Sequence, residues 1–138
     1  MTSDFVVAVH GLVYLQHKGC IASSEELAKN ICTNPARVRK VMAKMKALGI
    51  VTTREGHVGG YCPSPKLENT SLAQVAAALE MQFVETNWHS GSHNLNCLVS
   101  SGMSAVMEDI YATLNQACAE KLQKITIKKL EGKLFATK

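Results

Sequence analysis

Residues 33–62 have the sequence TNPARVRKVMAKMKALGIVTTREGHVGGYC and contain the clearest local structural signals in the chain. Either Thr33 or Asn34 can cap a helix, because its side chain can accept a hydrogen bond from the first helical turn. Pro35 suits the first helical position, where its missing N–H would have no partner in any case. Gly49 is typical of the residue that follows a helix. A helix is therefore predicted over residues 35–48.

The pattern changes from helical to extended immediately after that helix. Residues 50–54, Ile-Val-Thr-Thr-Arg, are rich in β-branched side chains, which favour strands. Residues 56–60 contain three glycines, and Tyr61-Cys62 returns to a strand-like composition before two prolines. This order predicts a β-hairpin directly after the helix.

Two further helices are predicted upstream of residue 33. Apolar residues recur at helical spacing over residues 5–18, and Gly19 supplies an end. Ser23 or Ser24 can cap a second helix, whose first turn carries Glu25 and Glu26 and which ends at residues 32–33. The second and third helices are thus joined by a turn of about three or four residues, which is the helix-turn-helix spacing.

The second half of the chain predicts a short helix over residues 71–81, a polar loop over residues 82–96, a long helix over residues 103–124 and a short helix from Thr126 to Leu130. The long helix has apolar residues at alternating spacings of three and four, which is typical of a seam between helices. Because a protein of this size cannot easily cover that apolar stripe with its own residues, dimerisation is predicted.

The expected fold is mainly α with a small β-hairpin. A winged helix-turn-helix DNA-binding domain, residues 1–66, precedes residues 67–138 with a linker helix, a sensor loop and a long C-terminal dimerisation helix.

Charge is distributed in blocks, although the net charge of the 138-residue chain is only +4. Residues 29–54 contain seven Lys or Arg and no acid, whereas residues 67–120 contain six acids and no Lys or Arg. The basic block suits a polyanion, and the alternative is a solvated basic face.

No apolar run approaches the length that spans a bilayer, and no signal peptide is apparent, so a cytoplasmic protein is expected. The sequence contains no Ser/His/Asp order, phosphate-binding glycine loop or HExxH motif, which argues against an enzyme.

The outer side of the helix over residues 35–48 is the predicted DNA-reading surface. Its alanines allow a close approach to the major groove, and the flanking Arg and Lys can contact phosphates or guanine edges. Capping is the main role expected of Asn34, and the hairpin tip is expected to reach the neighbouring minor groove. The predicted double-stranded DNA contacts are Asn34, Ala36, Arg37, Arg39, Lys40, Lys44, Arg54 and His57.

These segments together resemble the Rrf-two family of winged-helix regulators, which contains the iron–sulfur cluster regulator, the nitric-oxide-sensing repressor and the cysteine-metabolism repressor. The matching pieces include Ser-Ser-Glu-Glu-Leu-Ala at residues 23–28, residues 34–40, and Gly-Gly-Tyr at residues 59–61. The resemblance covers nearly the whole chain. It implies a homodimer with crossed C-terminal helices that represses by occupying a palindromic operator. Cluster-binding members have three closely spaced cysteines ahead of the long helix, but only Cys97 occurs here, so no cofactor is predicted.

Thiol chemistry is the predicted signal. The five cysteines contain no CxxC pair, which argues against a disulfide framework or a zinc finger. Cys32 precedes the DNA-reading helix among cationic neighbours that favour a reactive thiolate, and Cys97 precedes the long helix. We hypothesise that oxidation links Cys32 of one subunit to Cys97 of the other or forms a reversible adduct. The alternative for Cys32 is a buried helix-end residue, and Cys20 and Cys118 are expected to be packing residues.

Two other functions remain open from the sequence. A small ligand or a metal could bind at residues 82–97, where His89 and His93 lie near Cys97, although exposed loop residues are the simpler interpretation. A winged-helix protein-interaction module is the second, with the basic helix binding an acidic partner or RNA.

Overall fold

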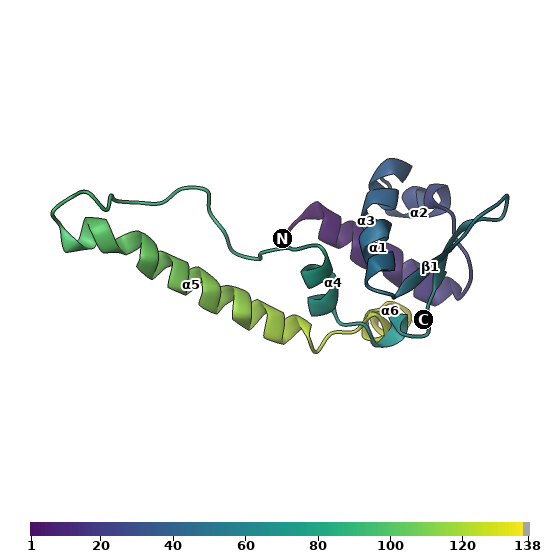
Figure 1. Ribbon diagram of the computed structural model, residues 1–138. Coiled ribbons are helices and arrows are strands. Elements are labelled where there is room, and N and C mark those ends of the chain that lie inside the picture. The colour runs from purple at the N-terminus through teal and green to yellow at the C-terminus, as the bar shows by residue number, and fades with distance from the viewer. Residues whose placement is uncertain (137–138) are drawn as a thin grey trace.

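The computed structural model describes residues 1–136, which form six α-helices, one 3₁₀-helix and one two-stranded hairpin (Figure 1). Most of the helices surround α1, while α5 extends away from this body as a separate arm. The elements are α1 (Ser3–Lys18), α2 (Ser24–Ile31), α3 (Pro35–Ala47), β1 (Val51–Arg54), β2 (Gly60–Pro63), η1 (Leu67–Asn69), α4 (Leu72–Ala78), α5 (Leu98–Leu122) and α6 (Ile127–Phe135). The predicted fold class is confirmed.

The predicted caps place the helix-turn-helix. The side chain of Ser23 accepts a hydrogen bond from the backbone N–H of Glu26 at 3.0 Å, and the side chain of Asn34 accepts one from that of Arg37 at 2.8 Å. Between them, Cys32 ends α2 in the left-handed conformation with φ 65°. The chain therefore reverses within Cys32, Thr33 and Asn34 before α3 begins at Pro35.

The hydrophobic core lies where α1, α2 and α3 meet. Leu12, Leu15 and Leu27 are fully buried, as is the inner side of α3. Each such side chain contributes about 1.5–3 kcal/mol relative to an exposed one. The core continues past residue 66, because Leu67, Val75 and Ile127 are also fully buried within it. The body that carries α3 therefore includes η1, α4 and α6.

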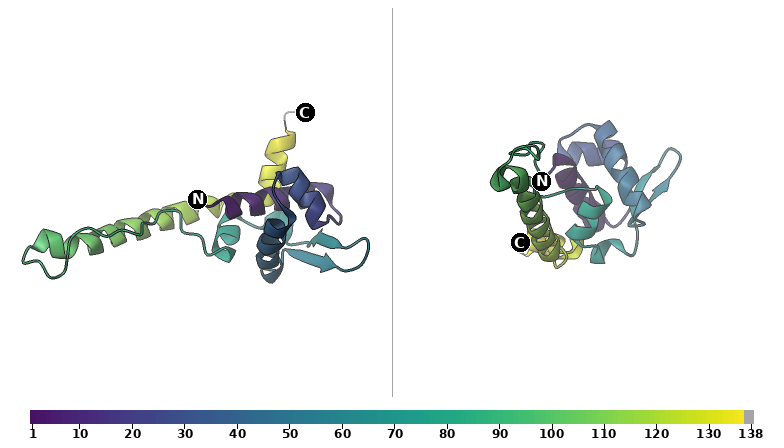
Figure 2. Two further views of the ribbon diagram at one scale, coloured as in Figure 1. Left: turned by 90° about the horizontal axis from the view of Figure 1, so that it is seen from above. Right: turned by 60° about the vertical axis from the view of Figure 1, so that its left-hand side comes forward.

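The hairpin is antiparallel and projects from the body, with Arg54 opposite Gly60 at its outer end (Figure 2). Strand β2 is held by Ala22, whose backbone N–H donates to the Tyr61 carbonyl at 2.9 Å and whose carbonyl accepts from the Tyr61 N–H at 2.8 Å. A Cβ at Gly60 would collide with the backbone of Ala22, and φ there is 150°. Gly60 is therefore required for this close approach rather than for any ligand contact.

The arm consists of α5 and residues 82–97, which run alongside it (Figures 1 and 2). The side chain of Asn115 accepts hydrogen bonds from the backbone N–H groups of Phe83 and Val84 at 2.8 and 2.9 Å, and donates to the Val84 carbonyl at 2.9 Å. His89 and Glu108 form an ion pair at 3.5 Å if the histidine is protonated. These contacts attach the loop to the helix.

The largest differences from the predicted helix boundaries lie in the second half of the chain. The long helix begins at Leu98 rather than residue 103, because Ser92 returns to donate its backbone N–H to the Ser100 carbonyl at 3.1 Å and supports a turn of weak helix formers. The fourth helix spans Leu72–Ala78, since Glu80 adopts φ 53° and ends it. The last helix continues beyond Leu130 to Phe135, where His17 of α1 stacks on Phe135 and contacts Glu131.

Ser71 joins the body to the end of the arm. Its hydroxyl accepts from the Gln74 backbone N–H at 3.1 Å, and its own backbone N–H donates to the Gln74 side chain at 2.9 Å, forming a capping box. The same hydroxyl donates to the Gln123 side chain at 3.2 Å, and Ser71 is only 2% exposed.

We predict that Ser71→Ala lowers the free energy of unfolding by about 1–2 kcal/mol, because the N-cap hydrogen bond to Gln74 and the hydrogen bond to Gln123 are both lost. Urea denaturation at fixed protein concentration measures this change. Ser104→Ala, on the arm, is the control and should change stability by less than about 0.5 kcal/mol. Equal stability of the Ser71 variant and the parent would contradict the prediction.

Candidate nucleic-acid interface

The two sides of α3 differ in burial as its sequence predicts. Val38, Val41, Met42 and Met45 are at most 1% exposed, and Leu48 at the C-cap is half-buried. The other side faces solvent, and its exposed residues are Ala36, Arg39, Lys40, Ala43, Lys44, Lys46 and Ala47. Small side chains thus alternate with cations on a surface that no part of the described chain covers.

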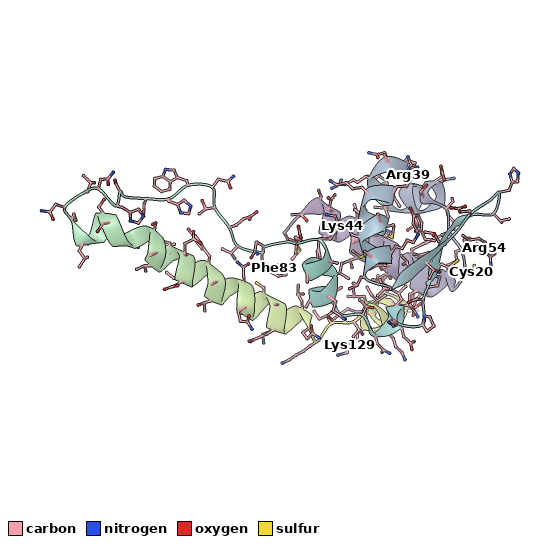
Figure 3. All side chains as sticks on the ribbon, viewed as in Figure 1. Cys20, Arg39, Lys44, Arg54, Phe83 and Lys129 are labelled. Atoms are coloured by element: carbon pink, nitrogen blue, oxygen red, sulfur yellow. The ribbon has the colours of Figure 1, made fainter. Side chains whose placement is uncertain are left out.

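The outward cations extend over α3 and the hairpin (Figure 3). Arg39 lies near the start of α3, where its guanidinium donates to the Ser24 hydroxyl at 3.3 Å, and Lys44 follows further along the helix. Arg54 and His57 are exposed on the hairpin, which projects away from α3. The exposed cations of α3 therefore lie on one surface, whereas Arg54 and His57 lie on the separate hairpin.

Arg37 is oriented differently from the other cations. Its Nε donates to the Asp4 carboxylate of α1 at 3.0 Å, and its Nη2 donates to the Ser3 hydroxyl. Lys40 approaches the other oxygen of Asp4 at 3.6 Å. These contacts, with the hydrogen bond from Arg37 as the largest cause, hold the pKa of the Asp4 carboxyl below its usual value.

Asn34 is exposed next to this cluster, but its side-chain oxygen is engaged by the backbone N–H of Arg37. The capping role expected of Asn34 is confirmed. A contact of Asn34 with a phosphate would use its amide N–H₂ group, because phosphate oxygens accept hydrogen bonds.

The two candidate redox cysteines are both exposed, and they lie far apart within one chain. Cys32 ends α2 in the body, and its thiol contacts the Lys29 carbonyl at 3.7 Å. Cys97 precedes α5 at the far end of the arm, where the backbone N–H groups of Ser100 and Val99 lower the pKa of its thiol. The buried alternative for Cys32 is therefore wrong. Cys20, expected to pack, is also exposed.

Residues 1–136 contain no group of three or more His, Cys, Asp or Glu side chains placed to hold a metal ion. In the part of the chain that the structure describes, no helix is both long and apolar enough to cross a membrane.

Comparison with known families matches residues 1–132 to Rrf2, described as an iron-dependent transcriptional regulator. The chain belongs to the Rrf2 family. It is accordingly a transcriptional regulator rather than an enzyme. The chain is also 26% identical over 137 residues to "Putative HTH-type transcriptional regulator YwnA" of Bacillus subtilis (strain 168), covering 98% of this chain and 99% of that protein.

Solved structures share the fold of this Rrf2 protein. A protein from Lactobacillus plantarum, described as a "putative transcriptional regulator", superposes with a TM-score of 0.84 at 23% identity, covering 97% of this chain and 91% of that one. IscR of T. potens superposes with a TM-score of 0.71 at 15% identity, covering 100% of this chain and 90% of that one. CymR, the global cysteine regulator of B. subtilis, superposes with a TM-score of 0.69 at 14% identity, covering 96% of each chain.

The family description mentions iron, but residues 82–103 do not provide the set of thiolates that an iron–sulfur cluster needs. Thiolates hold iron–sulfur clusters, and Cys97 is the only cysteine in residues 82–103. His89 is paired with Glu108 along α5 and does not gather with other ligands around Cys97. A cluster bound through this segment does not fit the residues present.

Sequence reasoning missed the contribution of α1 to the interface. Asp4 and Ser3 lie more than thirty positions from Arg37 along the chain, and only the packing of α1 against α3 brings them together. A second missed network joins Tyr14 and Lys18 of α1 to Glu26 of α2, with the Tyr14 hydroxyl 2.5 Å from the carboxylate. Hydrogen bonds from Lys18 and Tyr14 lower the pKa of Glu26.

Proposed function

We propose that this Rrf2 protein is a sequence-specific repressor that binds a palindromic operator as a cytoplasmic homodimer and responds to a thiol-reactive signal. The observation that carries the proposal is the outward side of α3, where exposed alanines alternate with exposed Arg and Lys. A surface of this kind suits a polyanion with a groove wide enough for a helix, which is duplex DNA.

The N-terminal end of the second helix of a helix-turn-helix meets the base edges. Ala36, Arg39 and Lys40 occupy this end of α3, whereas Lys44 lies one turn further and suits the phosphate backbone. The hairpin adds Arg54 and His57, which suit the adjacent minor groove or its phosphates.

The homodimer is supported by the exposure of α5. None of its 25 residues is buried. Its seam residues Val106, Ile110 and Leu114 are 51%, 43% and 45% exposed. A helix of about 37 Å with a continuous apolar stripe is unfavourable in water unless a second helix covers it. A second copy of the chain supplies the same stripe, as a two-fold symmetric interface requires.

The thiol signal is supported by the exposure of both cysteines and by the lowered pKa of Cys97. Within one chain their separation excludes a direct bond without rearrangement, so the proposed link joins two subunits. Hydrogen peroxide accepts two electrons and two protons from the two thiols and leaves as two water molecules, while the two sulfur atoms form the disulfide bond. This bond would connect the arm of one subunit to the turn before α3 of the other.

We predict that the purified protein selects a palindrome from a random duplex library and that log affinity falls linearly with log salt. Lys44→Ala should reduce the magnitude of that slope by about 0.9 per subunit, because one phosphate contact is lost. Lys128→Ala, an exposed lysine on α6, is the charge-matched control and should leave the slope unchanged. Binding that shows no preference between duplexes, or no salt dependence, would favour a protein-interaction module instead.

We predict that Ile110→Asp converts the dimer to a monomer, because it places a charge in the centre of the seam. Sedimentation equilibrium measures the change, and affinity for the two-fold operator should fall at least about tenfold since only one half-site is then engaged. Ala105→Asp, an exposed position on the opposite side of α5, should remain dimeric. A monomeric parent would contradict the proposed assembly.

We predict that hydrogen peroxide releases the parent from its operator and produces a covalent dimer on a non-reducing gel. Cys32→Ser and Cys97→Ser should each retain operator binding and remain free of the covalent dimer, while Cys118→Ser should respond as the parent does. The thiol proposal is wrong if the Cys32 and Cys97 variants lose binding under oxidant as the parent does. A response that needs a small ligand and no oxidant would favour the alternative sensor at residues 82–97.

A further inference from the structure

The start of α1 and the start of α3 meet in a small charged cluster. The Asp4 carboxylate receives the Nε–H of Arg37 at 3.0 Å on one oxygen and has Lys40 Nζ at 3.6 Å from the other. The Ser3 hydroxyl accepts a further hydrogen bond from Nη2 of Arg37. The side chains of Asp4 and Arg37 are 30% and 32% exposed, so this cluster is at the surface but not fully hydrated.

Asp4 supplies a charge that α3 lacks. α1 and α2 each carry acidic residues in their own first turns, where the positive end of the helix dipole favours them. The first turn of α3 has no acidic residue and instead contains Arg37, a cation at the positive end of the helix. From its place on α1, the Asp4 carboxylate offsets the charge of Arg37 and the positive end of the α3 dipole.

The contacts with Asp4 involve Arg37 and Lys40, which are two of the six predicted DNA-contacting residues within residues 34–44. Arg37 has given its Nε–H and one Nη2–H to α1, so a phosphate can obtain the full set of guanidinium donors only by displacing Asp4. Lys40 is less restrained, because its side chain is 68% exposed. The carboxylate itself repels any phosphate that approaches the same edge of α3.

We propose that Asp4 is a specificity-determining residue of this interface. By pairing with Arg37 and Lys40, Asp4 reduces their contacts with DNA phosphates and so weakens binding to non-operator DNA. This inference rests on the proposed function. Non-specific binding derives almost entirely from cation–phosphate contacts, whereas operator binding adds contacts to base edges. A negative charge beside the cations therefore reduces non-specific affinity more than operator affinity. Asp4 acts through Arg37 and Lys40 and is a positioning residue rather than a base contact.

The test compares Asp4→Asn with Glu131→Gln. Both variants remove one negative charge per subunit, but Glu131 lies on α6, where it is paired with His17 and is remote from α3. Dissociation constants are measured over a series of salt concentrations for the selected operator duplex and for a random-sequence duplex of equal length. Thermal unfolding verifies that each variant is folded, and Asp4→Ala provides a second neutral variant.

We expect Asp4→Asn to bind the random duplex about three- to tenfold more tightly than Glu131→Gln does, with a log–log salt slope steeper by about 0.9 per subunit. Operator affinity should change less, so the ratio of operator to random affinity falls. Asp4→Glu, which keeps the charge, should retain the parental ratio. In an Arg37→Ala, Lys40→Ala background, the Asp4→Asn substitution should have no greater effect than Glu131→Gln.

Two results overturn the inference. One is an Asp4→Asn variant whose ratio and slope equal those of Glu131→Gln, and the other is an equal loss of affinity for both duplexes, which indicates a merely structural role. A parent protein that does not distinguish the operator from random duplex refutes the proposed function and this inference with it. A parent that discriminates, combined with an unchanged ratio in the Asp4 variants, refutes the Asp4 inference alone.

Discussion

The rotation of α3 about its own axis is the constraint on which the candidate interface depends. Val38, Val41, Met42 and Met45 enter the core, where the terminal methyl of Met42 packs close to Gly11 of α1. With these side chains inside, the alanines and cations of α3 must face outward. A rotation of half a turn would bury Lys40 and Lys44 and expose the apolar residues, which is prohibitively unfavourable.

The interface is completed by parts of the chain that are distant in sequence. Ala22 bonds to Tyr61 of β2 and so orients Arg54 and His57 relative to the body. Asp4 of α1 engages Arg37 at the start of α3. The outer surface of α3 is therefore locally encoded, but the conformation of its first cation is set by another helix.

The arm and the body are oppositely charged and differently packed. The body buries its apolar residues, while α5 leaves Val106, Ile110 and Leu114 half open to water. Ser71 and Gln123 join the two parts at the C-terminal end of α5, and Asn115 attaches residues 83–84 to its middle. A change at the arm thus has direct hydrogen-bonded connections to α4 and the body.

The sequence alone determined the features that arise from neighbouring residues: the cap at Asn34, the turn before Pro35, the hairpin after Gly49, and the inward and outward sides of α3. These follow from side-chain chemistry and periodicity within a few positions. Tertiary structure decided the start of α5 at Leu98, the extension of α6 to Phe135 and the pairing of Asp4 with Arg37. The last two depend on partners that are distant in sequence, since His17 contacts Glu131 and Asp4 contacts Arg37, and no local pattern encodes which distant residue that will be. The start of α5 depends on the fold of the preceding loop, which returns Ser92 to Ser100.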